Sequence, residues 1–185
     1  MGVLTRGGVA LAIALTLVSF RGCHLEAQQP SAPQLVAAFL LNFVKFTTWP
    51  EASLPAGARI VICVLDDDRV ADALTQITIG KSVSGRPIEV RGATRRSVPS
   101  GCQMVYSGDL DRRRARQLIE VTSGLPILTV GVSSDFAELG GVANFFVDSG
   151  RMRFAVNTRA ADRSQLRISS KLLSLARIVQ HDGPA

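Results

Sequence analysis

The stretch that decides the fold is Arg59-Ile60-Val61-Ile62-Cys63-Val64-Leu65-Asp66-Asp67-Asp68. Residues 59–65 form a nearly continuous β-branched run, which is typical of a strand buried on both faces of a sheet. Aspartate is a preferred helix cap, so residues 66–68 predict a helix that runs to about Ile79. A buried strand followed directly by a helix indicates an α/β fold.

The segments downstream continue the alternation of strands and helices. They predict a turn at 80–85, strands at 87–91 and 103–107, a helix capped by Asp109 or Asp111 that runs to about Val121, and a second fully buried strand at 127–131. We therefore expect a mixed β-sheet in which buried strands need helices on both faces.

The last third of the chain changes character. We expect a short helix at 134–139, followed by strands at 142–147 and 151–156 around the hairpin signal Asp148-Ser149-Gly150. Asn157 can cap the segment after the second of these strands. A closing helix is predicted because apolar residues repeat there at helical spacing: Ile168, Leu172, Leu175, Ala176 and Val179.

Upstream of the deciding stretch, residues 34–46 carry a wide apolar helical face, and Trp49-Pro50 ends it because the residue before proline avoids the helical region. The expected organisation is one α/β domain over residues 34–181, with a short tail at 182–185. Residues 28–33 are rich in Pro, Ser and Gln and read as a flexible leader.

Residues 1–27 read as an export signal. Arg6 supplies a positive start, residues 9–20 form a charge-free apolar run, and residues 25–27 suit cleavage after Ala27. The run is shorter than the roughly 20 residues that span a bilayer. A cleaved signal peptide and a periplasmic protein are therefore expected, with an uncleaved anchor as the alternative.

The chain has three cysteines, and signal cleavage removes Cys23. Cys63 and Cys102 remain as an even pair in an oxidising compartment, where disulfides persist. A Cys63–Cys102 disulfide is predicted, and two buried free thiols are the alternative. Lipidation of Cys23 is a further alternative, although only Gly22 of the three preceding residues suits a lipoprotein box.

The residue types argue against an enzyme. The two histidines, His24 and His181, lie in the signal and near the C-terminus, so Ser-His and Cys-His machinery and the usual zinc ligand sets are missing from the core. Residues 66–68 together with Asp109 and Thr129 imitate the layout of a magnesium-binding receiver domain, but the mimicry is weak, and a capping and loop role is the favoured explanation of residues 66–68. We expect no catalytic residue, metal or cofactor.

The formal net charge is +6, which favours an anionic ligand, a membrane surface or an acidic partner. Nucleic acid is not expected, because there is one Trp, one Tyr and no basic run interleaved with aromatics. The run Arg112-Arg113-Arg114 with Arg116 is read as the solvated face of a helix.

The predicted closing helix carries a basic stripe of Arg163, Arg167, Lys171 and Ser174. It is either a solvated face or a docking or anion site, for which the candidates are Arg167, Lys171 and Arg177 because arginine's planar fork suits carboxylate or phosphate.

Four stretches resemble the YfiR-type periplasmic regulator family over nearly all of the mature chain. They are Leu41-Asn42-Phe43-Val44-Lys45-Phe46-x-x-Trp49-Pro50, Ile62-Cys63-Val64-Leu65, Ile127-Leu128-Thr129-Val130-Gly131 and Leu166-Arg167-Ile168-Ser169-Ser170-Lys171-Leu172-Leu173. The resemblance implies an α/β domain that forms a homodimer. It also matches Cys63 and Cys102 to a family disulfide, while a second pair found in the characterised member is missing here.

The resemblance further implies a non-enzymatic protein that represses an inner-membrane diguanylate cyclase through its periplasmic sensor domain, and that an outer-membrane lipoprotein can titrate away. A sensor kinase is another possible membrane partner. Trp49 is a candidate anchor for that partner, with ordinary core as the alternative. The competing function is a periplasmic module that binds a small anion or nucleotide and is coupled to a membrane sensor.

Overall fold

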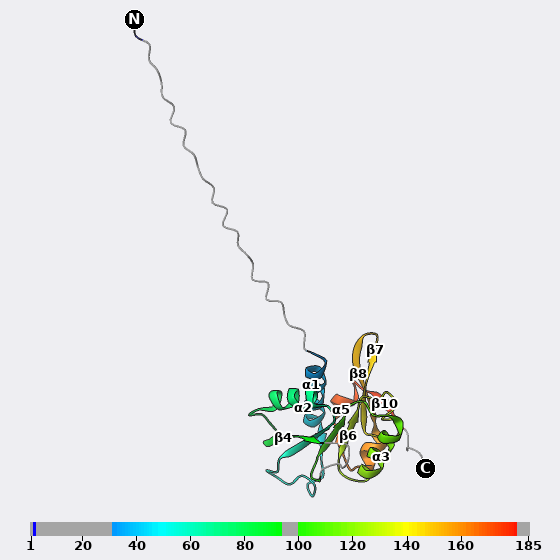
Figure 1. Cartoon of the computed structure of the whole chain (residues 1–185). Coiled ribbons are helices and arrows are strands. Elements are labelled where there is room, and N and C mark those ends of the chain that lie inside the picture. The colour runs from blue at the N-terminus through cyan, green and yellow to red at the C-terminus, as the bar shows by residue number, and fades with distance from the viewer. Residues whose placement is uncertain (1, 3–30, 94–99, 181–185) are drawn as a thin grey trace.

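The computed structural model describes residue 2 and residues 31–93 and 100–180. A mixed eight-stranded sheet forms the centre, with the order β10-β8-β7-β6-β5-β2-β4-β3, and β1 and β9 form a separate two-stranded sheet. Helices cover both faces of the large sheet (Figure 1). The predicted fold class, a single α/β domain with a mixed sheet, is confirmed.

The strands are β1 Thr47–Thr48, β2 Ile60–Leu65, β3 Ser82–Val83, β4 Arg86–Ala93, β5 Met104–Ser107, β6 Leu128–Gly131, β7 Ala143–Asp148, β8 Arg151–Asn157, β9 Arg167–Ile168 and β10 Arg177–Val179. The helices are α1 Ala32–Lys45, α2 Asp68–Thr78, α3 Arg112–Thr122, α4 Thr158–Arg163 and α5 Ser170–Leu173.

Strand β2 lies between β4 and β5, parallel to both, and all six of its residues are buried. Its side chains alternate between two cores. Ile60, Ile62 and Val64 pack with α1 and α2, whereas Val61, Cys63 and Leu65 pack with α3 on the opposite face. The prediction of a strand buried on both faces is correct.

The predicted disulfide joins β2 to the segment that leads into β5. Cys63 and Cys102 are bonded, with their Cα atoms 5.9 Å apart, and both side chains are buried in the core on the α3 side. The bond closes a separation of 39 residues. A loop of this length stabilises the fold by about 4 kcal/mol, because it restricts the unfolded chain.

Polar side chains cap the helices much as expected. Asp67 accepts a hydrogen bond from the Val70 N–H to start α2, and Asp111, rather than Asp109, caps α3. Helix α1 begins at Ala32, so the end of the expected flexible leader is helical. Ser31 and Gln34 form a reciprocal capping box there, and proline is tolerated in a first helical turn.

The predicted hairpin is present as β7 and β8, which project together beside α1 (Figure 1). Its turn is built from Ser149 and Gly150, both with positive φ, which matches the twist of the two strands. The rings of Phe39 and Phe43 on α1 pack against Phe145 and Phe154 of the hairpin, with centroids 5.2 to 6.1 Å apart.

The expected helix at 134–139 is absent, and a series of turns takes its place. The Phe136 ring is fully buried and packs against the backbones of Gly131 and Gly141. The side chains of Asn144 and Asn157, also fully buried, bond to the N–H and the C=O of Ala137. These tertiary contacts hold the segment in a shape that a regular helix could not adopt.

The prediction of one closing helix is also wrong. Asn157 does cap a helix, but α4 ends at Arg163, and the chain then forms β9, α5 and β10. β9 pairs with β1, and β10 pairs with β8. The apolar residues at helical spacing are therefore divided among several short elements. Pairing with other strands of the fold outweighs the local helical periodicity.

Apart from Gly2, the predicted signal peptide with Cys23 lies outside the described residues, as do residues 28–30, His181 and the predicted tail at 182–185. Within 31–93 and 100–180, no helix has the length and hydrophobicity needed to cross a bilayer.

Removing the disulfide tests how much of the stability depends on the β2 crosslink. We expect Cys63→Ala/Cys102→Ala to lower the free energy of unfolding by about 4 kcal/mol, since it restores the entropy of the unfolded chain. Urea denaturation measures this change. The wild type under reducing conditions is the control, and a loss below about 1 kcal/mol would contradict the prediction.

The packing of Phe136 gives a second test. A Cβ at Gly131 would lie 2.6 Å from the Phe136 ring, so Gly131→Ala should destabilise the protein by about 1–3 kcal/mol through overpacking. Gly92 is the matched control, because a Cβ there meets no atom within 4 Å. Gly92→Ala should be neutral or stabilising in the same denaturation experiment, and equal effects of the two substitutions would refute this account.

Candidate functional site

The predicted anchor Trp49 follows β1, at the edge of the large sheet where β2 and β5 begin. Its side chain is only 7% exposed, and its Nε1 donates a hydrogen bond to the backbone oxygen of Gln103 over 3.0 Å. The Gln103 side-chain oxygen accepts from the Val61 N–H over 2.9 Å. The indole is therefore part of the core and also ties the small sheet to the large one.

Next to this corner lies an open groove of about 490 Å³, which we call the Trp49 groove. It is lined by Thr48, Trp49, Pro50, Asp162, Gln165, Leu166 and Arg167. Arg167 reaches it because β9 pairs antiparallel with β1, which places Arg167 opposite Thr48. The groove thus combines an aromatic wall with a guanidinium, a carboxylate and an amide, a combination that suits a small polar ligand or a partner side chain.

Gln165 lines this groove in a left-handed backbone conformation, with φ 54°. It follows α4 in a Schellman arrangement, in which the Leu166 N–H bonds to Ala161 O and the Gln165 N–H to Asp162 O. Glycine is the usual residue at this position because a Cβ is unfavourable there. The groove therefore keeps an amide side chain at the cost of backbone strain, as binding sites often do.

Arg177 lies elsewhere, on β10 at one edge of the large sheet. Its guanidinium carbon stacks 4.2 Å from the centroid of the Phe146 ring, a cation–π contact. Two apolar side chains beside it in the chain are exposed to solvent: Leu175 is 69% and Ile178 is 44% exposed. We call Leu175, Arg177, Ile178 and Phe146 the β10 edge strip.

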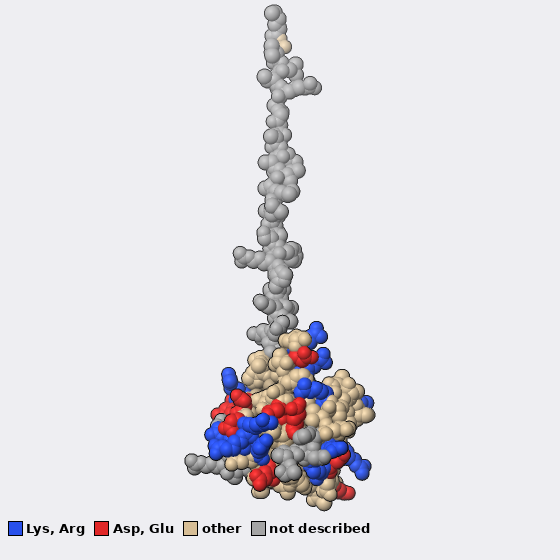
Figure 2. Space-filling model, turned by 90° about the vertical axis from the view of Figure 1, so that its right-hand side faces the viewer, with Lys and Arg blue, Asp and Glu red and all other residues tan. Residues whose placement is uncertain are grey.

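The third basic candidate, Lys171, is exposed on α5 and lines no wall of the Trp49 groove. The expected stripe of Arg163, Arg167, Lys171 and Ser174 does not exist as one helical face, because these residues are divided among α4, β9, α5 and the turn after it. Figure 2, which views the side of α3 and β10, shows basic side chains in several groups with acidic ones between them.

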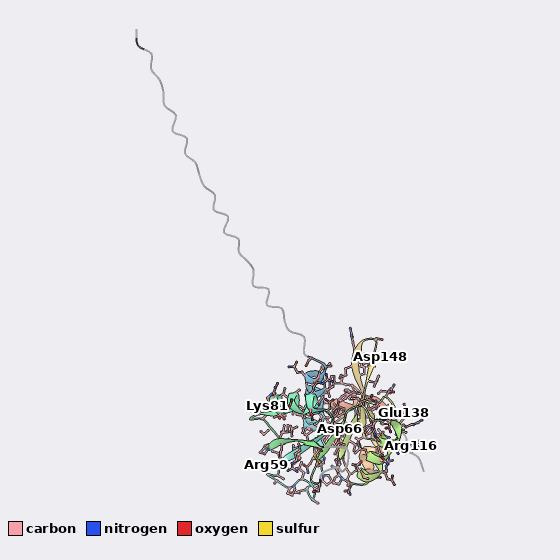
Figure 3. All side chains as sticks on the ribbon, viewed as in Figure 1. Arg59, Asp66, Lys81, Arg116, Glu138 and Asp148 are labelled. Atoms are coloured by element: carbon pink, nitrogen blue, oxygen red, sulfur yellow. A yellow bond between two sulfur atoms is a disulfide. The ribbon has the colours of Figure 1, made fainter. Side chains whose placement is uncertain are left out.

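The aspartates after β2 lie at the carboxyl edge of the sheet, and Asp66 is labelled near the middle of the molecule in Figure 3. Asp67 caps α2 and lies 3.4 Å from the buried Tyr106 hydroxyl. Burial, aided by this carboxylate, raises the pKa of Tyr106 far above its usual value, so its phenol stays protonated. The described residues contain no group of three His, Cys, Asp or Glu side chains able to hold a metal.

Three site residues were not indicated by the sequence: Asp162, Gln165 and Phe146. The groove arises only when β9 pairs with β1, and Phe146 meets Arg177 only when β10 joins the sheet. The signal that could have identified Gln165 is the left-handed residue that often follows the end of a short helix. The apolar residues at helical spacing after it predicted a continuing helix instead.

A family model described as YfiR/HmsC-like matches residues 33–177, which is more than half of the chain. The match extends from α1 through the first residue of β10, and it includes the disulfide, the Trp49 groove and the hairpin. It confirms the resemblance that the sequence motifs indicated.

The strain at Gln165 can be measured. We expect Gln165→Gly to raise the free energy of unfolding by about 0.5–1 kcal/mol, because glycine relieves a left-handed penalty of about 1–2 kcal/mol and loses part of the gain to its own flexibility. The control Gln117→Gly on the exposed face of α3 should destabilise by about 1 kcal/mol. If both substitutions destabilise in urea denaturation, Gln165 is not strained.

Proposed function

Because the chain belongs to the YfiR/HmsC-like family, we propose that it is a non-enzymatic periplasmic regulator that binds and represses a membrane signalling protein. Several observations support this assignment. The Cys63–Cys102 disulfide fits an oxidising compartment, and no described helix could span a bilayer. The described residues present grooves and an exposed apolar edge, features that suit binding.

The partner we propose is the periplasmic sensor domain of an inner-membrane diguanylate cyclase, so that binding lowers the output of cyclic di-GMP. The physical mechanism is a population shift. The regulator binds the inactive conformation of the cyclase more tightly than the active one, and repression is limited by that difference in affinity. An outer-membrane lipoprotein that competes for the regulator would relieve repression, and the regulator itself would act as a homodimer.

The observation that carries this proposal is the β10 edge strip. An edge strand offers unpaired backbone groups to another chain. Here the strand is short and carries the exposed Ile178 together with Arg177, and Leu175 precedes it. Arginine is one of the residue types that most often dominate binding energy at protein interfaces, and the exposed apolar side chains beside it add hydrocarbon surface that a partner can bury. Arg177 is already held in place by Phe146, which reduces the entropy lost on binding.

A second candidate function rests on the Trp49 groove. Its volume and its mixture of Arg167, the indole and an amide also suit the capture of a small anion or nucleotide. In that case the protein would report a periplasmic ligand to a membrane sensor. The sole tryptophan of the chain lines this groove, so ligand binding there should change its fluorescence.

The β10 edge strip predicts which substitution abolishes repression. We expect deletion of the gene in its native host to raise cellular cyclic di-GMP, and complementation by the wild type to reverse the rise. Ile178→Asp should fail to reverse it, because loss of a central apolar anchor costs about 2 kcal/mol, or about 30-fold in affinity. Mass spectrometry of cell extracts measures the nucleotide.

The matched control is Ile79→Asp. Ile79 is 72% exposed at the end of α2, and α2 and β10 lie on different sides of the molecule in Figure 1. This variant should complement fully. No rise on deletion, with the wild-type protein exported and folded, would exclude the cyclase and favour another membrane sensor or ligand capture. Full complementation by Ile178→Asp would exclude the β10 edge strip instead.

A further inference from the structure

The arginines at the start of α3 do not all have the same surroundings. Arg112 forms an ion pair with Asp135 over 3.4 Å, and Arg114 forms one with Asp111 over 3.3 Å. Arg116, one turn after Arg112, has no ion pair within the described part of the chain and instead lines a pocket. The basic run is therefore more than a solvated face at this position.

This pocket, which we call the α3–α4 pocket, has a volume of about 420 Å³. The last turns of α3 form one wall, and Arg163 and Ser164 at the end of α4 form part of another. Its volume lies within the range of about 300–1,000 Å³ that is typical of small-molecule sites. It is distinct from the Trp49 groove, with which it shares no lining residue.

The interior of the pocket combines apolar surface with a fixed hydroxyl. Ile119 and the buried Leu139 and Val142 supply hydrocarbon surface. Thr129, which is only 4% exposed, accepts a hydrogen bond from the Val142 N–H over 3.0 Å. Because that bond uses an oxygen lone pair, the Thr129 hydroxyl hydrogen can still be donated to a ligand.

The charges around the pocket indicate which ligand fits. Arg116 lines the pocket, and a guanidinium group favours a planar carboxylate or a phosphate. Glu120 also lines the pocket, one turn after Arg116, and has no ion pair in the described residues. Its negative charge disfavours a multiply charged anion such as a phosphate monoester. We propose that the α3–α4 pocket binds small organic monocarboxylates that carry an apolar group.

The test uses phenylacetate as the probe and phenylacetamide as its neutral analogue of the same shape. Phenylacetate is titrated into the ¹⁵N-labelled mature protein and followed by two-dimensional NMR. We expect saturable shifts at the amides of Glu120, Gly124 and Gly140, which line the pocket. Phenylacetamide should bind at least about tenfold more weakly, because a charge-assisted hydrogen bond is about twice as strong as a neutral one.

Arg116→Gln should weaken phenylacetate binding about tenfold, since one guanidinium contact is lost. Arg113→Gln is the matched control on the same helix, because Arg113 is exposed and does not line the pocket, and it should bind like the wild type. Fluorescence of the sole tryptophan, Trp49, should stay unchanged, since Trp49 lies in the other groove.

Three results would overturn the proposal. They are an absence of saturable shifts, equal binding of phenylacetate and phenylacetamide, and shifts centred on Trp49 and Arg167 rather than on α3. The comparison of the two probes uses the wild type alone, so the proposal remains testable even if Arg116→Gln does not fold. The outcome is also independent of the cyclic di-GMP measurement, because it concerns a different part of the surface.

Discussion

Strand β2 buries side chains on both of its faces, and this double burial constrains everything around it. A strand with no solvent-facing side needs a cover of apolar side chains above and below the sheet. The covers are α1 and α2 on one face and α3 with the Phe136 turns on the other. The disulfide from Cys63 anchors β2 to the start of β5, and the Trp49 indole joins the small sheet to the same place through Gln103.

The proposed binding surfaces lie at the periphery of this anchored core. The Trp49 groove forms where the small β1–β9 sheet meets the end of α4, and the β10 edge strip forms where the large sheet ends. Both depend on short elements after residue 157, whose backbone is held by pairing with distant strands. A regulator needs surfaces that a partner can reach, and a crosslinked core lets such surfaces carry exposed apolar or strained residues such as Ile178 and Gln165.

Membership of the YfiR/HmsC-like family and the geometry of these margins support the same kind of function, recognition of a partner rather than chemistry. At the carboxyl edge of the sheet, where α/β enzymes often place their sites, Asp67 has a structural role. Asp67 starts α2, and the Tyr106 phenol lies within 3.4 Å of its carboxylate. Exposed charged side chains lie elsewhere. Arg116 lines the α3–α4 pocket, and Arg177 lies on β10 at the edge of the sheet.

The sequence by itself determined the α/β class, the doubly buried β2, the hairpin around Ser149 and Gly150, a helix cap within residues 66–68, the cap at Asn157, the pairing of Cys63 with Cys102 and the family. These features depend on local patterns, or on the small number of cysteines. Only the tertiary structure decided the shape of residues 134–139 and the fate of the closing segment. There Phe136 packs against two glycine backbones, and β9 and β10 pair with strands far away in the chain. Helical periodicity is a local signal, and strand pairing over long separations and close packing outweigh it. The candidate arginines therefore lie in separate places rather than on one face.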